Sequence, residues 1–333
     1  KKEIIDKLAK GELDIVIGTH AVLEAGIKFK DLKLIVIDEQ HRFGVRQRAA
    51  LRQKGDKADM LIMTATPIPR TLFLALYGDL DLSVLTDMPP GRKPVKTESA
   101  DEAAALQVVR LETSKRRQAY IVYPVIEESE TKTLKSVKAE FERLKEVFKD
   151  RRLAMLHGGM PGLEKERVMG EFAKGKIDIL VATTVIEVGI DVPNATVMVV
   201  NNAENFGLAS LHQLRGRVGR GRWESRCLLV SHAATADGAE RIEAMCSTNS
   251  GFEISERDSY IRGAGEVLGV RQHGDMEFRI ADLARDGEIL KLAIEDRDAL
   301  LAEDPALMKP ENAGLRHNLL KLYQGKWNII DLS

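Results

Sequence analysis

Two neighbouring carboxylates, Asp38 and Glu39, directly follow an apolar run at residues 34–37. A buried strand of a parallel sheet reads as such an uninterrupted run, and α/β proteins bind ligands where these strands end. One carboxylate at that place can hold Mg²⁺ through water, and its neighbour can orient and deprotonate a water molecule for phosphoryl transfer. The alternative is a solvated loop with two acids, and the position after the run makes the two interpretations about even.

A second segment with distinctive chemistry, residues 213–222, has four arginines, three glycines and no acidic residue. An arginine guanidinium is a rigid fork with a permanent charge, and against a transferred γ-phosphoryl group it accelerates the reaction by roughly 10³ to 10⁵. The competing interpretation is a basic surface that binds a nucleic-acid backbone without catalysis.

A loop of threonine and proline at residues 63–70 follows the apolar run 60–63. Small hydroxyl side chains at a strand end can hydrogen-bond phosphate oxygens or a neighbouring carboxylate, so the loop could couple two sites. The plain alternative is a proline-rich turn capped by threonine.

Apolar runs alternate with helical stretches along most of the chain, which predicts βαβ units, a parallel sheet and therefore an α/β fold. Between 134 and 148 apolar residues recur every three or four positions, the pattern of an amphipathic helix. After Ser231 helices and loops are expected. The strand candidates are residues 15–17, 34–37, 60–63, 120–123, 153–156, 179–182, 197–200 and 227–230.

Prolines at 89, 90 and 94 exclude a helix or a central strand there and mark a boundary. We expect a first domain at 1–88, a linker at 89–96, a second domain at 97–232 and a smaller helical region at 233–333.

The composition is that of an ordinary globular protein. The 333 residues contain 50 Lys and Arg against 51 Asp and Glu, a formal net charge of -1, and 44% of them are hydrophobic. These values argue against disorder and against whole-chain polycationic binding. No apolar run approaches the ~18 residues that cross a bilayer, and the first six residues have no apolar stretch of the kind that a signal peptide requires. The two cysteines cannot build a disulfide framework. We therefore expect a cytoplasmic protein, and the start without Met in an apparent helix indicates a piece of a longer chain.

Four segments resemble, in order and spacing, motifs II, III, V and VI of superfamily-2 helicases. They are most similar to those of the RecG family of branched-DNA helicases, and the resemblance covers about residues 11–274. It implies RecA-like parallel-sheet lobes, the first incomplete and the second complete, followed by a mostly helical C-terminal region. The four segments are residues 38–45, 64–70, 183–194 and 213–220.

The resemblance also assigns roles on the nucleotide side. Asp38 would take the Mg²⁺ role, Glu39 would activate the water, and Arg217 and Arg220 would reach the γ-phosphate from the second lobe. ATP and Mg²⁺ are the implied cofactors. The residues that would support or close the nucleotide cleft are Gln213, Gly189 and Asp191.

The implied partner is branched double-stranded DNA, with replication-fork proteins as further partners and no membrane. A lone histidine such as His157 is more often a surface residue, and Thr183 and Thr184 could merely cap a helix. The implied DNA contacts are Thr64, Thr66, His157, Gly158, Thr183 and Thr184.

A glycine-rich stretch at 262–274 resembles the translocation segment that RecG shares with the Mfd transcription-repair coupling factor. There Arg262 and Gln272 would link motif VI to a helical hairpin and a hook-shaped loop. An Mfd-like translocase is the nearest alternative. Gln40, the proline-rich linker and residues 271–274 favour RecG, whereas Tyr260 departs from the charged residue expected before Arg262.

No Gly-x-x-x-x-Gly-Lys-Ser/Thr phosphate loop occurs in the sequence. Because such a loop supplies most contacts to the nucleotide phosphates, the chain is expected to be an inactive C-terminal fragment, which also lacks the wedge domain of RecG. The full-length protein would be an ATP-dependent DNA translocase that remodels stalled forks and Holliday junctions in recombination and repair. An alternative from another class is an ATP-independent module that binds DNA or protein through residues 213–222.

Overall fold

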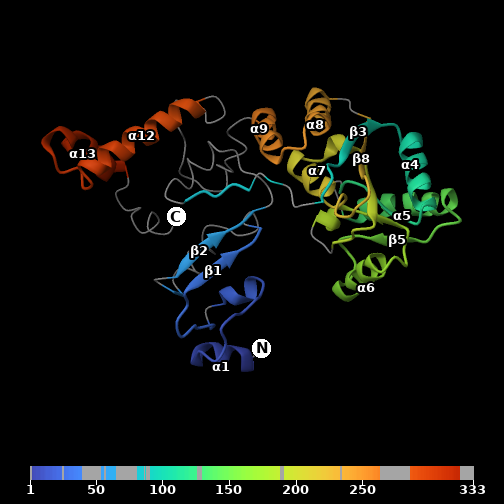
Figure 1. Cartoon of the computed structure of the whole chain (residues 1–333), viewed down its shortest axis with the longest axis horizontal. Helices are drawn as coiled ribbons and strands as arrows, with labels where there is room; N and C mark the ends of the chain where they lie inside the picture. The colour runs from blue at the N-terminus through green and yellow to red at the C-terminus, as the bar shows by residue number, and fades with distance from the viewer. Residues whose placement is uncertain are drawn as a thin grey trace. The chain divides into compact units, whose positions relative to one another are not determined.

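The structure is a computed structural model that describes residues 2–24, 26–39, 54–55, 58–64, 81–85, 87, 91–125, 130–187, 191–232, 235–262 and 286–322. The chain divides into two compact units (Figure 1). The first unit contains residues up to Thr66 and residues from Asp286 onward, and the second is built mainly on Leu80–Arg285. The four-part division expected from the sequence stays a prediction.

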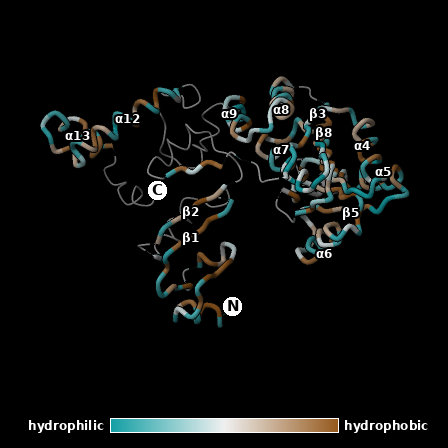
Figure 2. The backbone as a smooth tube through the Cα atoms, in the orientation of Figure 1, coloured by the Kyte–Doolittle hydropathy of each residue, from teal (hydrophilic) through white to brown (hydrophobic). Residues whose placement is uncertain are grey.

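Two parallel strands, β1 (Leu34–Ile37) and β2 (Asp59–Ile62), form the sheet of the first unit. They follow helix α1 (Lys2–Lys10) and the 3₁₀ turn η1 (His20–Leu23). Ile35 and Ile37 are buried, whereas Leu34 and Val36 are 56% and 52% exposed. The described residues therefore cover only one face of these strands, whose hydropathy is drawn along the backbone in Figure 2.

The predicted strand at residues 15–17 is wrong. These residues form no strand, and the side chains of Ile15 and Ile17 are 81% and 93% exposed. An apolar run becomes a strand only where a neighbour completes the hydrogen-bond ladder. No described segment pairs with this one.

The second unit contains a sheet of six parallel strands in the order β3-β8-β7-β4-β6-β5. Every strand of this sheet except β3 confirms one of the five apolar runs predicted between residues 120 and 230. The edge strand β3 has no such run and was not predicted. The strands are β3 (Lys96–Ala100), β4 (Gln118–Val122), β5 (Leu153–Leu156), β6 (Ile179–Ala182), β7 (Ala195–Asn201) and β8 (Arg226–Val230).

Helices cover both faces of this sheet because successive strand residues point to opposite sides. Ala119 and Ile121 of β4 pack with α4 (Glu102–Ser114) and α5 (Glu130–Val147), which confirms the amphipathic helix. Tyr120 and Val122 pack with the other layer. That layer contains α6 (Gly162–Ala173), α7 (Leu208–Arg215), α8 (Ala236–Ser247) and α9 (Gly251–Arg262).

The C-terminal residues of the first unit are helical, as expected. They form α12 (Gly287–Glu303), the turn η5 (Pro310–Asn312) and α13 (Ala313–Leu322). The Asp304 carboxylate ties the connection together, since it accepts hydrogen bonds from the backbone N–H groups of Met308 and Lys309 and from the Asn312 amide. Within the described ranges, none of the helices has the length and apolar character needed to cross a bilayer.

Candidate functional site

The two carboxylates lie at the carboxyl edge of the first sheet, where the sequence placed them. Asp38 follows β1, and Thr64 lies two residues beyond β2 at the same edge because Ile37 is paired with Ile62. The Glu39 N–H donates to Asp38 Oδ1 over 2.9 Å. Glu39 also has a left-handed backbone with φ of 54°, a conformation that costs a non-glycine residue roughly 1–3 kcal/mol and is found at functional sites.

The donor chemistry at this edge fits Mg²⁺. Carboxylate oxygens are the ligands that Mg²⁺ prefers, and protein sites hold it through one or two carboxylates while water and substrate phosphates complete the shell. Asp38 is exposed at the strand end and so can serve as such a ligand. Among the described residues there is no cluster of three or more acidic, histidine or cysteine side chains of the kind that would enclose a metal fully.

In the second unit, the charges of Asp191, Arg217 and Arg220 all act on Tyr120 of β4. Arg220 Nη1 lies 3.5 Å from Asp191 Oδ1, and Arg220 Nε donates to the Gly216 carbonyl over 2.9 Å. Burial raises the pKa of Tyr120 to about 12, the charges of Arg217 and Arg220 act against that shift, and Asp191 adds to it. The structure thus brings together three predicted nucleotide-side residues and adds Tyr120, which the sequence showed only as a core strand residue.

The glycines of this segment are required by the backbone. Gly219 has φ of +77°, and a Cβ there would lie 2.6 Å from Val95 Cγ2. At Gly221 a Cβ would lie 2.2 Å from the Pro193 carbonyl oxygen, closer than any real contact. Arg220 lies between these two glycines, so their close packing fixes the backbone position from which the Arg220 side chain extends.

Arg215, in the same segment, makes buried hydrogen bonds that the sequence did not predict. Its side chain is buried (4% exposed). The guanidinium donates to the carbonyls of Met245, Thr248 and Asn249 over 3.2, 2.7 and 3.2 Å, and lies 2.9 Å from His212 Nδ1. It therefore joins the end of α7 to the junction of α8 and α9.

His212 is neutral in this arrangement. Burial, and then the adjacent charge of Arg215, lower the pKa of His212 to about 4. An arginine can only donate, so Nδ1 of His212 must accept the hydrogen bond and Nε2 carries the proton. A buried cation held by carbonyls and an imidazole, without a carboxylate partner in the described part of the chain, is a demanding arrangement that depends on every acceptor.

The predicted DNA-side residues of the second unit lie at the carboxyl edge of its sheet. His157 and Gly158 follow β5, Thr183 and Thr184 follow β6, and these two strands are neighbours with Leu156 opposite Ala182. Thr183 is 3% exposed, whereas Thr184, the first residue of the 3₁₀ turn η3 (Thr184–Glu187), is half-buried. Thr184 is therefore the threonine of the pair that reaches solvent.

His157 is partly enclosed by basic residues. Burial lowers its pKa, and the charges of Lys138 and Lys165 act in the same direction. Lys165 Nζ also donates to the Gly158 carbonyl over 2.6 Å. Positive charge from α5 and α6 thus lies beside the residues predicted to meet a DNA backbone.

Thr183 and Asp191 mark opposite ends of the sheet. Thr183 follows β6, while Asp191 precedes β7, and the two strands run parallel on either side of β4. At about 3.3 Å per residue the two edges of these strands are ~15 Å apart. One stretch of eight or nine residues therefore connects the threonines of the carboxyl edge with the Asp191–Arg220 pair.

The remaining predicted site residues lie outside the described residues or have no described contact to the site. Gly189, Thr66 and Gln272 lie outside the described residues, and Arg262 is described only as the last residue of α9. Gln213 lies in α7, four residues before Arg217, and is half-buried. The roles assigned to all these residues stay predictions.

Three family models match consecutive parts of the chain. Residues 1–73 match a model described as DEAD/DEAH box helicase, and residues 101–222 match the helicase conserved C-terminal domain. Residues 248–331 match the C-terminal part of domain 3 of the ATP-dependent DNA helicase RecG.

Curated relatives carry the same name. The chain is 52% identical to RecG of Thermotoga maritima over 300 residues, covering 89% of this chain and 38% of that protein. It is 45% identical to RecG of Bacillus subtilis over 327 residues, covering 96% of this chain and 48% of the relative. The chain therefore spans less than half the length of these two proteins.

Solved structures agree with the sequence comparison. The structure of RecG bound to a three-way DNA junction matches with a TM-score of 0.66 and 46% identity, over 87% of this chain and 38% of that one. A structure of Mss116p bound to single-stranded RNA and AMP-PNP matches at 21% identity with a TM-score of 0.54, over 73% of this chain and 53% of that one, and supports the fold alone. These comparisons favour the RecG type over the transcription-repair coupling type.

Proposed function

Because the chain belongs to the RecG family of ATP-dependent DNA helicases, we propose that the full-length protein is an ATP-dependent double-stranded DNA translocase that remodels branched DNA. The relative whose structure matches is bound to a three-way DNA junction. Stalled forks and Holliday junctions are the corresponding substrates. This chain contributes the carboxylates, the arginines and the DNA-side threonines.

The observation that carries the proposal is the placement of the two ends of residues 183–191. Thr184 lies at the carboxyl edge of the sheet, and Asp191 lies 3.5 Å from Arg220 near its other edge. A change in the position of Arg220 during the ATP cycle would move Asp191, and the same stretch of chain leads from Asp191 to the DNA-side threonine. This is a physical route by which phosphate chemistry moves a DNA contact.

In ATP hydrolysis, the Glu39 carboxylate orients a water molecule and accepts its proton as the water oxygen bonds to the γ-phosphorus. The bond between that phosphorus and the leaving oxygen of ADP breaks, so phosphate and ADP are the products. Asp38 is the residue that would hold Mg²⁺, which neutralises phosphate charge when bound. The hydrogen bond from the Glu39 N–H to Asp38 Oδ1 ties the two residues together at the strand end, and a carboxylate positioned before the reaction has less to reorganise at the moment of reaction.

Arg217 and Arg220 supply the positive charge for the transferred phosphoryl group. Asp191 holds Arg220 by a loose contact of 3.5 Å in which the Arg220 side chain is 30% exposed. Such a contact is weak enough to exchange for a phosphate oxygen, which a guanidinium fork binds well. Gln213, four residues before Arg217, supports the same face.

Arg215 and His212 transmit the position of α7 to the helices behind it. Since the Arg215 guanidinium bonds directly to the carbonyls between α8 and α9, a shift of α7 moves that junction too. Arg262, at the end of α9, leads from this junction into the segment that carries Gln272. We assign the movement of DNA to this connection.

The test is an unwinding assay on labelled forked DNA and on a Holliday junction with the full-length protein. The proposal predicts conversion of both substrates with ATP and none with a non-hydrolysable analogue. Binding that ignores ATP, without conversion, would return the protein to the class of ATP-independent binding modules.

The chain by itself has no Gly-x-x-x-x-Gly-Lys-Ser/Thr segment, and it is expected to bind ATP weakly while still binding DNA electrostatically. Its DNA affinity should fall with salt at a log-log slope of about -0.9 per phosphate neutralised. Micromolar ATP binding, or DNA binding indifferent to salt, would contradict this assignment.

A further inference from the structure

A cavity of about 450 Å³ opens at the amino edge of the six-stranded sheet, on the side covered by α4. Its apolar part comes from Val108 and Leu111 of α4 and from Trp223. Around them stand five cationic side chains but only two carboxylates, those of Glu112 and Glu224. None of Asp191, Arg217 and Arg220 lines it, and neither do the residues of the carboxyl edge. The five cations are Lys93, Lys115, Arg117, Arg222 and Arg226.

Two of these cations stack on the same indole ring. The guanidinium carbons of Arg117 and Arg222 each lie 4.5 Å from the centroid of Trp223. Arg117 is also ion-paired with Glu112, which accepts a further hydrogen bond from Lys115 over 2.7 Å. Arg117 therefore shows that a guanidinium stacked on Trp223 still binds a carboxylate through its N–H edge.

Arg222 is the second stacked guanidinium, and in the described part of the chain no carboxylate pairs with it. The pairs of the other cations at the rim are loose: Arg226 lies 3.5 Å from Glu98, and Lys93 lies 3.8 Å from Glu224. Exposed pairs of this kind contribute little and exchange readily. The cavity thus offers positive charge that its own acids do not neutralise.

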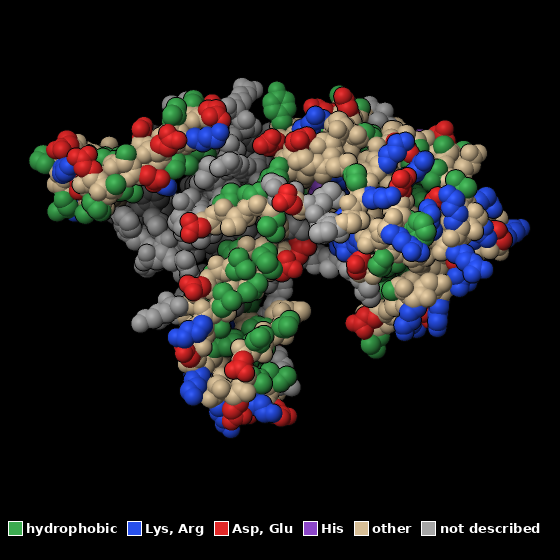
Figure 3. Space-filling view, viewed as in Figure 1, with side chains coloured by type: hydrophobic (Ala, Val, Ile, Leu, Met, Phe, Trp, Pro, Cys, Tyr) green, Lys and Arg blue, Asp and Glu red, His purple; other side chains and the backbone are tan. Residues whose placement is uncertain are grey.

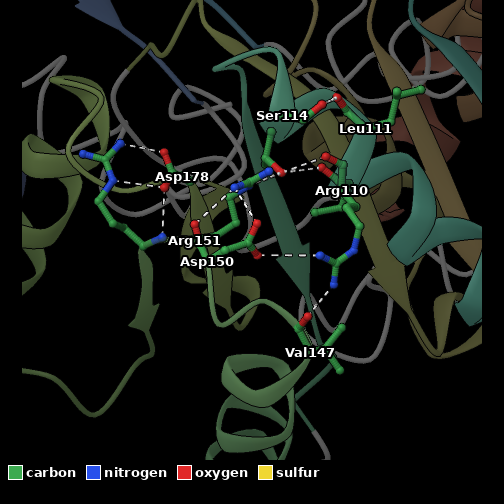
Figure 4. Close-up of polar contacts among 10 residues, drawn as sticks. Arg110, Leu111, Ser114, Val147, Asp150, Arg151 and Asp178 are labelled. Carbon is green, nitrogen blue, oxygen red and sulfur yellow. Dashed lines mark hydrogen bonds and ion pairs between the residues drawn. The ribbon is translucent and has the colours of Figure 1, made fainter.

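The neighbouring basic surface differs in this respect. Lys and Arg side chains gather over the region of α4, α5 and β5 (Figure 3). There Arg110 and Arg151 both contact Asp150, at 3.6 and 2.7 Å, and Asp178 accepts a hydrogen bond from Arg152 (Figure 4). These three arginines are paired with carboxylates of the chain, whereas the cavity contains a cation, Arg222, that is free to bind the carboxylate of a partner.

We propose that this cavity is a docking site for an acidic peptide segment of a partner protein. Aspartate or glutamate carboxylates of the segment bind the N–H edge of Arg222 and the rim cations, as Glu112 binds Arg117. An apolar side chain of the segment enters the cavity against Val108, Leu111 and Trp223. The site is separate from the DNA-side residues, which lie at the opposite edge of the same sheet, so the partner and DNA can be held together.

The geometry favours a peptide over nucleic acid. The phosphates of a duplex lie on a convex cylinder and cannot enter a cavity, whereas single side chains can. A single-stranded base would need an open aromatic face for stacking. The ring of Trp223 already has the guanidinium groups of Arg117 and Arg222 as its stacking partners.

The experiment measures fluorescence anisotropy of a labelled peptide in which aspartates alternate with leucine and phenylalanine. The matched control peptide has asparagine in place of every aspartate. The full chain is expected to bind the acidic peptide at least tenfold more tightly than the control peptide. Arg222→Glu should weaken acidic-peptide binding by tenfold or more, because it replaces an attraction by a repulsion.

Two further variants separate docking from general charge or misfolding. Leu111→Ser, on exposed α4 and outside every helicase motif, should weaken the mixed peptide but leave a purely acidic peptide unchanged. Arg167→Glu, a charge reversal at an exposed residue of α6, should change neither. Circular dichroism checks that all three variants are folded.

The proposal is overturned by an acidic peptide that binds no better than its asparagine control. It is equally overturned if Arg167→Glu weakens binding as much as Arg222→Glu. Displacement of the peptide by single-stranded or duplex DNA, with equal sensitivity of DNA binding to Arg222→Glu, would make the cavity a nucleic-acid site instead.

Discussion

Replacement of Arg215 by methionine tests whether the second unit depends on the bonds between α7 and the α8–α9 junction. The wild-type side chain is 4% exposed and has four acceptors, the three carbonyls of Met245, Thr248 and Asn249 and the imidazole of His212. Methionine has a similar length and no donor. The variant therefore removes the hydrogen bonds while filling most of the space.

The expected loss of unfolding free energy is about 3 kcal/mol. Four hydrogen bonds at a net value of ~1 kcal/mol each give roughly 4 kcal/mol. Buried acceptors that are left without any donor would add to this loss. Methionine recovers part of it, of the order of 1 kcal/mol, because an apolar side chain pays no cost for burying a charge. Arg215→Lys should lose less, since lysine keeps the charge and some of the bonds.

Urea unfolding followed by far-ultraviolet circular dichroism measures the loss, which at a slope of ~2 kcal/mol per molar urea lowers the midpoint by ~1.5 M. Amide hydrogen exchange should also become faster in peptides that contain residues 248–250. Arg167→Met is the control, because that side chain is 61% exposed and its pair with Glu171 is 3.5 Å long; it should change stability by less than ~0.5 kcal/mol. A loss below 1 kcal/mol in Arg215→Met, or an equal loss in the control, would refute the assignment.

Three further outcomes follow from individual residues. The pKa of His212 is about 4 in the folded chain against 6.5 in the unfolded chain, so between pH 6.5 and 4 the unfolded chain binds a proton that the folded chain does not. The free energy of unfolding should therefore decrease by up to roughly 3 kcal/mol as the pH falls through that window. His212→Asn keeps an acceptor but cannot titrate, so its unfolding free energy should depend less on pH. Gly221→Ala should lower the melting temperature because its Cβ would meet the Pro193 carbonyl oxygen, whereas Gly170→Ala in α6, with open space around it, should be neutral or stabilising. Arg220→Ala should lower kcat for DNA-stimulated hydrolysis in the full-length protein by roughly 10³; an effect confined to DNA affinity would make the arginines a binding surface only.

The strands that sequence reasoning found and those it missed differ in their position in the sheet. β4, β6 and β7 are buried on both faces and therefore show as uninterrupted apolar runs. β3 lies at an edge, and its sequence Lys-Thr-Glu-Ser-Ala has no such run. Residues 15–17 show the opposite error, since the apolar run is present but no described strand lies beside it.

The candidate site shows the same limit. Asp38, Glu39 and the arginine segment could be proposed as site residues because their residue types, and the place of the two carboxylates after a strand, are visible in the sequence. The sequence could not show which arginine of the segment is buried and structural and which one is exposed and able to bind a ligand. The burial of Arg215 depends on the carbonyls of Met245, Thr248 and Asn249, which lie 30 or more residues downstream, in α8 and its connection to α9, and carry no sequence signature.

The acidic-peptide cavity was equally invisible, because its lining comes from α4, the starts of two strands and the residues after the arginine segment. No local pattern places these residues together. Only the strand order, with β8 between β3 and β7, brings Trp223 beside α4.

The most direct test of the central claim is steady-state ATP hydrolysis by the full-length protein on forked DNA, compared between wild type and Glu39→Gln. Glutamine keeps the shape of the side chain but cannot accept the proton, so the account predicts turnover reduced by roughly 10² to 10⁴ while equilibrium ATP binding stays largely unchanged. Hydrolysis within tenfold of wild type would rule out Glu39 as the base and contradict the account.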